Sequence, residues 1–215
     1  MEFPFLTDAF LNALEDTGAA TPSRGWGPCH LRDGDALMPV YARDGSRGEY
    51  VFDFAWADAY ERNGLAYYPK LVTAIPFTPV VGPRWRGDWR PRQLWEGVRE
   101  RVREQGASGW HLLFPDHATR EALHELPLVE RQACHFRWFN RGYQDFEAFL
   151  AGFNSRKRKS VRRERRRVAE QGLTVTRLTG ANIDPQSWRF FFHCYANTYL
   201  VRGQLPYLSE AFFRR

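Results

Sequence analysis

The sequence predicts an α+β fold, in which short strands form a mixed sheet and amphipathic helices cover it. Two observations carry this prediction. Short apolar runs with strand periodicity are separated by turn signals, and the first of these signals, Asp33-Gly34-Asp35, predicts a hairpin. Other segments have helical spacing, most clearly Arg92 to Glu104, where Leu94, Val98 and Val102 fall on one face.

The first half of the chain alternates helices and strands. A helix begins at Thr7 or Asp8, both good capping residues, and runs to Asp16, with Gly18 closing it. Further helices are expected at 56–63, ended by Gly64, and at 92–104. Strands are expected at 29–32 and 36–43, which the hairpin signal joins, and at 50–56, where aromatic residues recur at period two. The segment 67–75 is expected to begin as a loop and continue as a strand, and 109–114 is a short apolar strand.

The pattern changes near residue 140. Before it, a helix at 118–125 and a strand at 133–139 complete a first domain, for which the expected bounds are 1–140. After it, helices are expected at 145–151, 155–171 and 185–200, with one strand at 173–178, and we place a second domain at 141–215. One strand forms no sheet by itself. The aromatic face of helix 185–200 is therefore expected to lie partly open, which favours a homo-oligomer or a separate partner.

The composition is that of a globular protein, since 43% of the 215 residues are hydrophobic and 16% are aromatic. The chain has no run of about 18 apolar residues that would span a membrane, and its first residues do not resemble a secretory leader. Its three cysteines cannot all pair, which favours a reducing compartment, and we expect a cytoplasmic protein. Each cysteine adjoins a histidine, but neighbours on a strand point to opposite faces, so no metal site is expected.

One segment, Asn154 to Glu170, holds nine basic and two acidic residues, so its balance of +7 exceeds the net charge of +6 of the whole chain. Ser155 can cap a helix there, and the positive N-terminus of that helix would attract an anion. We assign phosphate binding to Arg158, Lys159 and Arg162, with a phosphorylated substrate, a cofactor pyrophosphate or an RNA backbone as ligand. The alternative is a solvated basic face, in which the like charges repel one another.

A first candidate site combines carboxylates with aromatic rings. Glu49 and Asp53 can accept a proton from an attacking amine or orient it, and they are the candidate catalytic residues. Tyr50 and Trp56 belong to an aromatic row that can stack on sugars or acyl chains. Because aromatic rows at strand spacing usually face a core, the alternative reading is a buried row with Asp53 as a structural acceptor.

A second candidate site is a proline-rich loop that follows Tyr68 and Lys70. Three prolines between Ile75 and Arg84 exclude regular structure and hold the loop in place, which suits a binding wall. Lys70 and Arg84 are natural partners of a phosphate or carboxylate, and Tyr68 and Thr78 complete the proposed substrate contacts. The alternative reading is a rigid connection between elements.

These stretches, in this order, resemble the FemAB-like predicted N-acyltransferases that are labelled peptidoglycan biosynthesis or recognition proteins. The resemblance covers essentially the whole chain. It is carried by Gly48-Glu49-Tyr50-Val51-Phe52-Asp53, Trp56-Ala57, Tyr67-Tyr68-Pro69-Lys70, Pro76-Phe77-Thr78-Pro79, Gly82-Pro83-Arg84, Trp138, Asn140-Arg141-Gly142-Tyr143, Ser155-Arg156-Lys157-Arg158-Lys159, Arg162-Arg163-Glu164-Arg165 and Tyr207-Leu208.

The resemblance implies two domains like those of GNAT acyltransferases and the transfer of an acyl or aminoacyl group to an amine, in cell-wall precursor metabolism. It implies acyl-CoA or aminoacyl-tRNA as the donor. The chain has no Arg/Gln-x-x-Gly-x-Gly/Ala run, the usual pyrophosphate loop of GNAT enzymes. The resemblance also implies that the second domain is only begun in these residues and that further catalytic groups lie beyond them. The rival prediction is a non-catalytic module that binds anions or nucleic acid through the basic helix.

Overall fold

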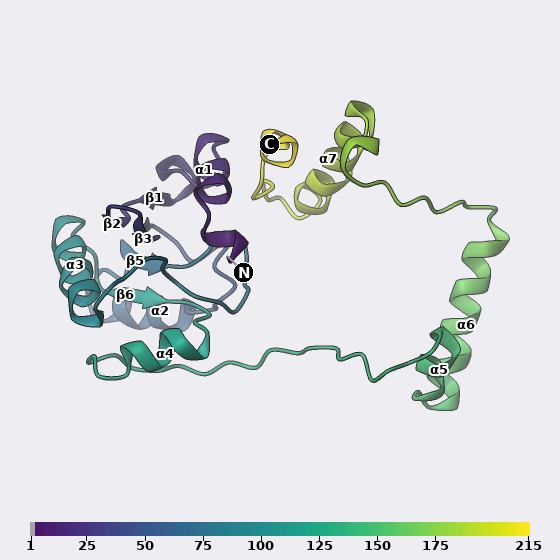
Figure 1. Cartoon of the computed structure of the whole chain (residues 1–215), viewed down its shortest axis with the longest axis horizontal. Coiled ribbons are helices and arrows are strands. Elements are labelled where there is room, and N and C mark those ends of the chain that lie inside the picture. Colours follow the sequence, from purple (N-terminus) through teal and green to yellow (C-terminus); the bar gives the residue numbers. More distant parts are fainter. Residues whose placement is uncertain (1–2) are drawn as a thin grey trace. The chain divides into compact units, whose positions relative to one another are not determined.

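The computed structural model describes residues 3–215, and its contacts divide the chain into two compact units. The first unit holds the chain up to Val129 together with Asp184–Arg215, and the second unit holds Glu130–Ile183. Figure 1 labels the elements of both. The two domains expected from the sequence, 1–140 and 141–215, remain a prediction, and Asp184–Arg215 packs with the first unit.

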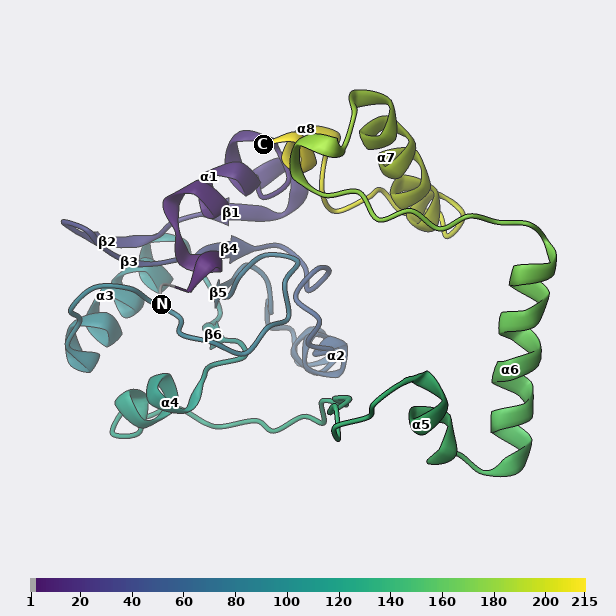
Figure 2. The same cartoon turned by 45° about the vertical axis from the view of Figure 1, so that its right-hand side comes forward.

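A mixed four-stranded sheet forms the centre of the first unit. Its strand order is β1-β4-β5-β6, which Figure 2 shows from top to bottom. β1–β4 and β4–β5 pair antiparallel, whereas β5–β6 pair parallel, and β2–β3 form a separate hairpin. The bounds are β1 Trp26–Pro28, β2 Leu31–Asp33, β3 Ala36–Met38, β4 Tyr41–Arg43, β5 Lys70–Thr73 and β6 Trp110–Leu112.

Polar side chains cap most of the helices. The Thr7 hydroxyl accepts from the Phe10 amide at the start of the first helix, and Asp184 accepts from the Ser187 amide in the same way. In the described residues, no helix combines the length and the apolar character that crossing a membrane requires. The bounds are α1 Asp8–Asp16, α2 Phe54–Arg62, α3 Pro91–Glu104, α4 His117–Leu123, α5 Phe146–Ala151, α6 Ser155–Glu170, α7 Pro185–Leu200 and α8 Glu210–Arg214.

The two faces of the sheet are covered differently. On one face, Leu94 and Val98 of α3 pack against Leu71 of β5, in the largest core cluster. On the other face, Trp26 and Tyr41 pack with residues of α1 and of the turn that follows it. Since residues opposite each other in neighbouring strands share a face, this second face also carries the side chains of Arg43 and Lys70. The first face is therefore a conventional apolar core, and the second holds charges.

The C-terminal segment returns to the first unit. Tyr207 stacks on Phe77 with ring centroids 4.9 Å apart, and Phe212 meets Phe10 edge-on at 5.9 Å. Phe213 of α8 contacts three aromatic residues of α7, namely Trp188, Phe191 and Tyr195. The aromatic face of α7, expected to lie partly open, is thus partly covered by α8, while Phe191 keeps 43% of its surface exposed.

The α+β class and the mixed sheet are confirmed, as are the seven expected helices, most of them to within about two residues. Three expected strands are wrong: 50–56 forms a loop and the start of α2, while 133–139 and 173–178 have no ladder partner among the described residues. The strand β1 was missed because it contains a glycine and a proline. Proline is tolerated there because β1 lies at the edge of the sheet.

Gly48 fixes the loop between β4 and α2, and its replacement tests that loop. Its φ is +85°, and a Cβ at this position would lie 2.7 Å from a ring carbon of Phe77. We expect Gly48→Ala to lower the free energy of unfolding by about 2–4 kcal/mol, because backbone strain and overlap add. Gly64→Ala is the control, since φ is +69° there but nothing lies within 4 Å. If urea unfolding gave equal decreases in the free energy of unfolding for the two variants, the close approach of Gly48 to the Phe77 ring would be contradicted.

Candidate functional site

The candidate site begins with two cations that the sheet places side by side. In the antiparallel register of β4 and β5, Arg43 lies directly opposite Lys70. Both are buried, with 2% and 0% of their surface exposed. Like charges opposite each other destabilise a sheet, and buried charges need partners. The fold therefore requires anions on this face.

Two carboxylates from one short segment meet that requirement. Glu49 bridges the cations: its Oε1 accepts from Arg43 Nε at 3.0 Å and its Oε2 from Lys70 Nζ at 2.8 Å. Asp53 Oδ2 accepts from Lys70 Nζ at 2.5 Å and from the hydroxyl of Tyr67 at 2.6 Å. Arg43, Glu49, Asp53 and Lys70 form a charge-balanced group, which we call the buried ionic quartet.

Local backbone conformation turns the two carboxylates inward. Gly48 and Tyr50, on either side of Glu49, both have positive φ, of +85° and +59°. A positive φ is unusual for tyrosine and is maintained only where surrounding contacts enforce it. Asp53 stands at the N-cap of α2 and makes no side-chain capping bond, although aspartate is a favoured capping residue. Its carboxylate binds Lys70 and Tyr67 instead.

The quartet is connected to the protein surface through hydroxyl groups. Lys70 Nζ donates to Ser46 Oγ at 2.9 Å, and Ser46 Oγ lies 2.8 Å from the hydroxyl of the half-buried Tyr68. On the other side, the guanidinium of Arg43 stacks 3.7 Å from the centroid of Trp26. Arg43 Nη1 and Asp53 Oδ1 are buried without a hydrogen-bond partner among the described residues. Sequence reasoning missed Arg43 and Ser46, because nothing in the sequence revealed which cation lies opposite Lys70.

The surroundings shift the carboxylate pKa values in opposite directions. Burial acts to raise the pKa of Asp53, but hydrogen bonds from Lys70, Ser46 and Tyr67 outweigh it and hold the pKa below its ordinary value. Burial raises the pKa of Glu49, and the attraction of Lys70 and Arg43 opposes that rise. Burial, with the hydrogen bond to Asp53, raises the pKa of Tyr67 well above its ordinary value. Asp53 is thus the more firmly ionised carboxylate.

The role expected for Lys70 and Arg84, which is to hold an anionic group of the substrate, stays a prediction, while the structure shows which atoms each cation binds. An ammonium has three N–H donors, and Lys70 directs its donors to Ser46, Glu49 and Asp53. The buried Arg84 donates to four backbone carbonyls, and burial lowers its pKa to about 10. Those carbonyls belong to Val80, Pro83, Leu113 and Phe114. Arg84 therefore fastens the proline-rich loop to the chain after β6.

The aromatic row of the first candidate site faces solvent. Tyr50, Phe52, Phe54 and Trp56 have 45%, 75%, 51% and 58% of their surface exposed. The buried row of the alternative reading is wrong, because the charges of Glu49 and Asp53 occupy the interior of this segment. The contacts of Asp53 with Lys70 and Tyr67 agree with the other half of that reading, in which Asp53 is a structural acceptor. Thr78, the remaining expected contact, donates within its own loop to Pro76 O at 3.1 Å. The segment therefore exposes its aromatic rings to solvent, while the buried ionic quartet holds its backbone in place.

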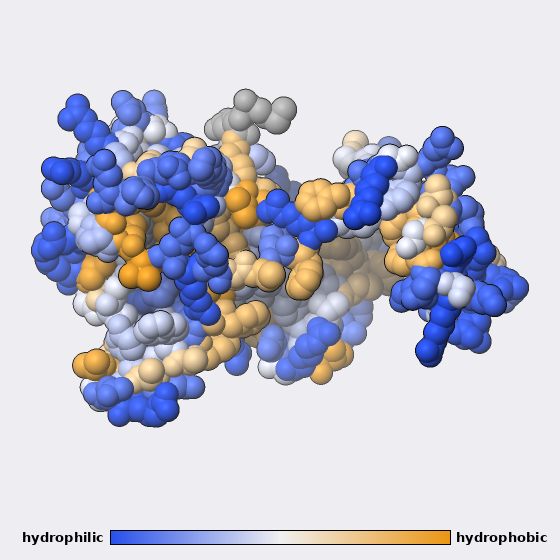
Figure 3. All heavy atoms as spheres, turned by 90° about the horizontal axis from the view of Figure 1, so that it is seen from below, coloured by the Kyte–Doolittle hydropathy of each residue, from blue (hydrophilic) through white to orange (hydrophobic). Residues whose placement is uncertain are grey.

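The basic segment forms α6 with a capping residue other than the one expected. Asn154, not Ser155, accepts from the Lys157 amide. Of the three expected phosphate ligands, Arg158 donates to Phe153 O at 2.9 Å, and Arg162 Nε donates to Glu147 at 3.1 Å. Lys159 is exposed. Figure 3 shows the hydrophilic side chains of this unit at the right of the view.

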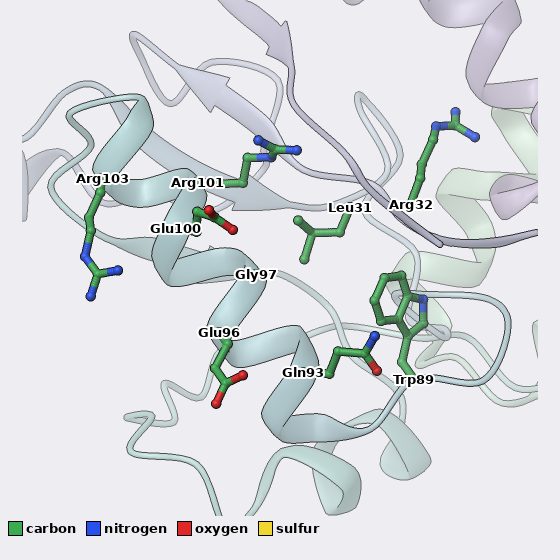
Figure 4. A pocket seen from close by; sticks show the side chains of 9 residues that line it. All are labelled: Leu31, Arg32, Trp89, Gln93, Glu96, Gly97, Glu100, Arg101 and Arg103. Atoms are coloured by element: carbon green, nitrogen blue, oxygen red, sulfur yellow. The ribbon is translucent and has the colours of Figure 1, made fainter. Parts of the chain in front are cut away.

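A hollow of about 470 Å³ lies between β2 and α3, away from the quartet. In Figure 4, Leu31 lies at the centre of this hollow, and Glu96 and Arg103 point away from Leu31. The lining carries acidic and basic groups in similar number and offers no single charge to a ligand. It consists of Leu31, Arg32, Trp89, Gln93, Glu96, Gly97, Glu100, Arg101 and Arg103. Among residues 3–215, no three His, Cys, Asp or Glu side chains are grouped as metal ligands would be.

Removal of the Lys70 ammonium tests the quartet as a unit. In the Lys70→Met variant two buried carboxylates lose their shared cation, so we expect the free energy of unfolding to fall by about 3–5 kcal/mol. The matched control is Lys157→Met at an exposed position of α6, where a change below about 0.5 kcal/mol is expected. Urea unfolding measures both variants. If Lys70→Met lowered the free energy of unfolding by less than about 1 kcal/mol, water would already screen the charges of the quartet.

The pH dependence of stability tests the ionised state of Asp53. Because its folded pKa lies below the ordinary value of 3.8, its contribution is present above that value and is lost as the pH falls through the folded pKa. We therefore expect Asp53→Asn to cost most near pH 7 and progressively less below about pH 4. Glu49 is present in both proteins, and its raised pKa has the opposite effect, since it lowers the stability as the pH rises. A stability difference that stays constant down to about pH 3 would contradict this assignment.

Comparison with known proteins gives one result that bears on this site. Searches among curated proteins and among solved structures gave no match. A family model described as peptidoglycan biosynthesis/recognition, FemAB-like, matches residues 1–215. That range includes the quartet, the exposed aromatic row and the basic helix. The chain therefore belongs to the FemAB-like family, which is associated with peptidoglycan biosynthesis.

Proposed function

We propose that this chain belongs to an N-acyltransferase that moves an acyl or aminoacyl group to an amine of a cell-wall precursor. The observation that carries the proposal is membership of the FemAB-like family over residues 1–215. The geometry adds support, because the buried ionic quartet holds the exposed aromatic segment in one conformation. Direct attack of an amine on a positioned acyl donor needs orientation above all, and a preorganised wall supplies it.

Each part of the site has a proposed role. Tyr50, Trp56 and Tyr68 bind the substrate, because the first two expose their rings and the third joins the surface to Ser46. Glu49 and Asp53 act as positioning residues, because both are buried and bind Lys70. Direct deprotonation of an amine by either carboxylate would require a ligand atom to replace a cationic partner.

The acyl donor is proposed to be acyl-CoA or aminoacyl-tRNA, both of which carry phosphates. Phosphate binding by α6 fits either donor, with Lys159 and Arg162 as the exposed members of the three residues expected from the sequence. The test is an assay of acyl transfer to precursor amines with each donor in parallel. Transfer from one donor identifies it. No transfer from either donor, by a protein that holds these residues together with the rest of the second domain, contradicts the proposed reaction.

Trp56→Ala tests the aromatic wall. Trp56 is exposed in the first turn of α2, so its removal should leave the fold intact. We expect kcat/KM to fall by about 10-fold or more, with Trp56→Phe retaining most of the activity, because stacking needs a ring. Phe190→Ala, at an exposed position of α7, is the matched control. Equal activity of the Trp56→Ala and control variants would remove Trp56 from the site.

The second candidate function is a non-catalytic module that binds anions or nucleic acid. The observation that favours it is the length and exposure of α6, a 16-residue helix with nine basic residues. Tight, salt-sensitive binding of RNA together with no transfer from either donor would favour this function over catalysis.

A further inference from the structure

Two residues near the candidate site have a backbone conformation that residues other than glycine rarely adopt. Tyr50 and Phe77 have φ of +59° and +60°, in the left-handed region. Such a conformation persists only where the surroundings fix it by several contacts. The buried ionic quartet fixes Glu49, the neighbour of Tyr50, from the interior. A second restraint is therefore expected on the outer side of these residues.

The ring of Tyr207 contacts both of these residues. It stacks on Phe77 with ring centroids 4.9 Å apart and ring planes at 17°, and it meets the ring of Tyr50 edge-on at 6.4 Å. Burial and the nearby phenols of Tyr199 and Tyr207 raise the pKa of Tyr50, which agrees with this placement. Tyr50 still has 45% of its surface exposed. One ring thus joins the start of the aromatic row to the proline-rich loop and leaves much of Tyr50 open to a ligand.

Phe77 transmits this restraint to the segment that carries Tyr50. The Phe77 amide donates to Gly48 O at 3.3 Å, and the Phe77 ring occupies the space that a Cβ of Gly48 would need. On the side of the sheet, the same ring contacts Trp26 at 5.2 Å. The segment 48–50 is therefore held from the interior by ion pairs and from the outside by Phe77 and Tyr207.

Tyr207 is itself held by hydrogen bonds of the residues on either side of it. The carbonyl of Pro206 accepts from Arg24 Nη2 at 2.6 Å. The amide of Leu208 donates to the hydroxyl of Tyr195 in α7 at 3.1 Å. The backbone on both sides of Tyr207 is thus fastened to the first unit, so its ring is a fixed support for the rings that it contacts.

We propose that Tyr207 is a positioning residue of the acyl-transfer site, which holds Tyr50 and the proline-rich loop in the orientation that binds the substrate. This inference rests on the proposed function, in which Tyr50 contacts the substrate. The quartet holds Glu49 and Asp53, whereas Tyr207 holds the ring of Tyr50, which lies outside the quartet. A wall that is already ordered loses less conformational entropy when the substrate binds.

Amide hydrogen exchange of the 215-residue chain tests this role without an assay of activity. The Phe77 amide reports on its contact with Gly48, and the Leu71 amide, which donates to Gly109 O at 2.8 Å, reports on the sheet. In Tyr207→Ala we expect Phe77 to exchange at least about tenfold faster, with a much smaller change at Leu71. Tyr207→Phe should keep the original rates, because the contacts are made by the ring. Equal acceleration of both amides, or no acceleration at Phe77, would overturn the proposal.

Phe212→Ala is the matched control for the loss of an aromatic ring from the same segment. Phe212 is half-buried, as Tyr207 is, but it meets Phe10 of α1 at 5.9 Å. Its removal should leave the exchange rate of the Phe77 amide nearly unchanged. If Phe212→Ala accelerated that amide as much as Tyr207→Ala does, the positioning role would belong to the segment as a whole, and its assignment to Tyr207 would be wrong.

Kinetics of acyl transfer separate this inference from the proposed function. In a protein that holds these residues together with the rest of the second domain, Tyr207→Ala should raise KM about tenfold with a smaller fall in kcat, because a loosened wall weakens substrate binding. Tyr207→Phe should restore the original KM. An unchanged KM in Tyr207→Ala, despite faster exchange at Phe77, would overturn the positioning role. If the original protein transfers no acyl group from either donor, the proposed function fails, whereas the exchange rates still decide whether Tyr207 holds this segment.

Discussion

The structure of the first unit depends on the pairing of Arg43 with Lys70 across β4 and β5. Two buried cations at opposite positions of a sheet cannot be tolerated without anions. Glu49 binds both, and Asp53 binds Lys70. The conformation of the segment that carries these carboxylates follows from this requirement, including the positive φ of Tyr50 and the missing capping bond of Asp53.

The same requirement reverses the usual arrangement of polar and apolar side chains in that segment. Its charges lie inside and its aromatic rings outside, although the rings have the greater hydrophobicity. Because the rings are exposed, they contribute little to the stability of this segment, which buried ion pairs hold in its conformation. They are well suited to bind a ligand, since little conformational entropy remains to be lost when a rigid wall takes it up.

The two units differ in how their apolar surface is covered. In the first, helices α1 and α3 cover the two faces of a sheet, and α8 covers part of α7. In the second, α5 and α6 bury one leucine, and the charge of the unit opposes its packing against a like surface.

The sequence by itself determined the helices, the hairpin at Gly34 and the basic segment, because helical periodicity, capping residues and charge runs are local properties. It also indicated Glu49 and Asp53 as members of one candidate site and Lys70 as a member of another. Only the tertiary structure decided which partners they bind. Strand register placed Arg43 opposite Lys70, which made the carboxylates structural partners and turned Trp56 outward. Segments 133–139 and 173–178 show the same limit, because period-two patterning gives a strand only when a neighbouring strand supplies its hydrogen bonds.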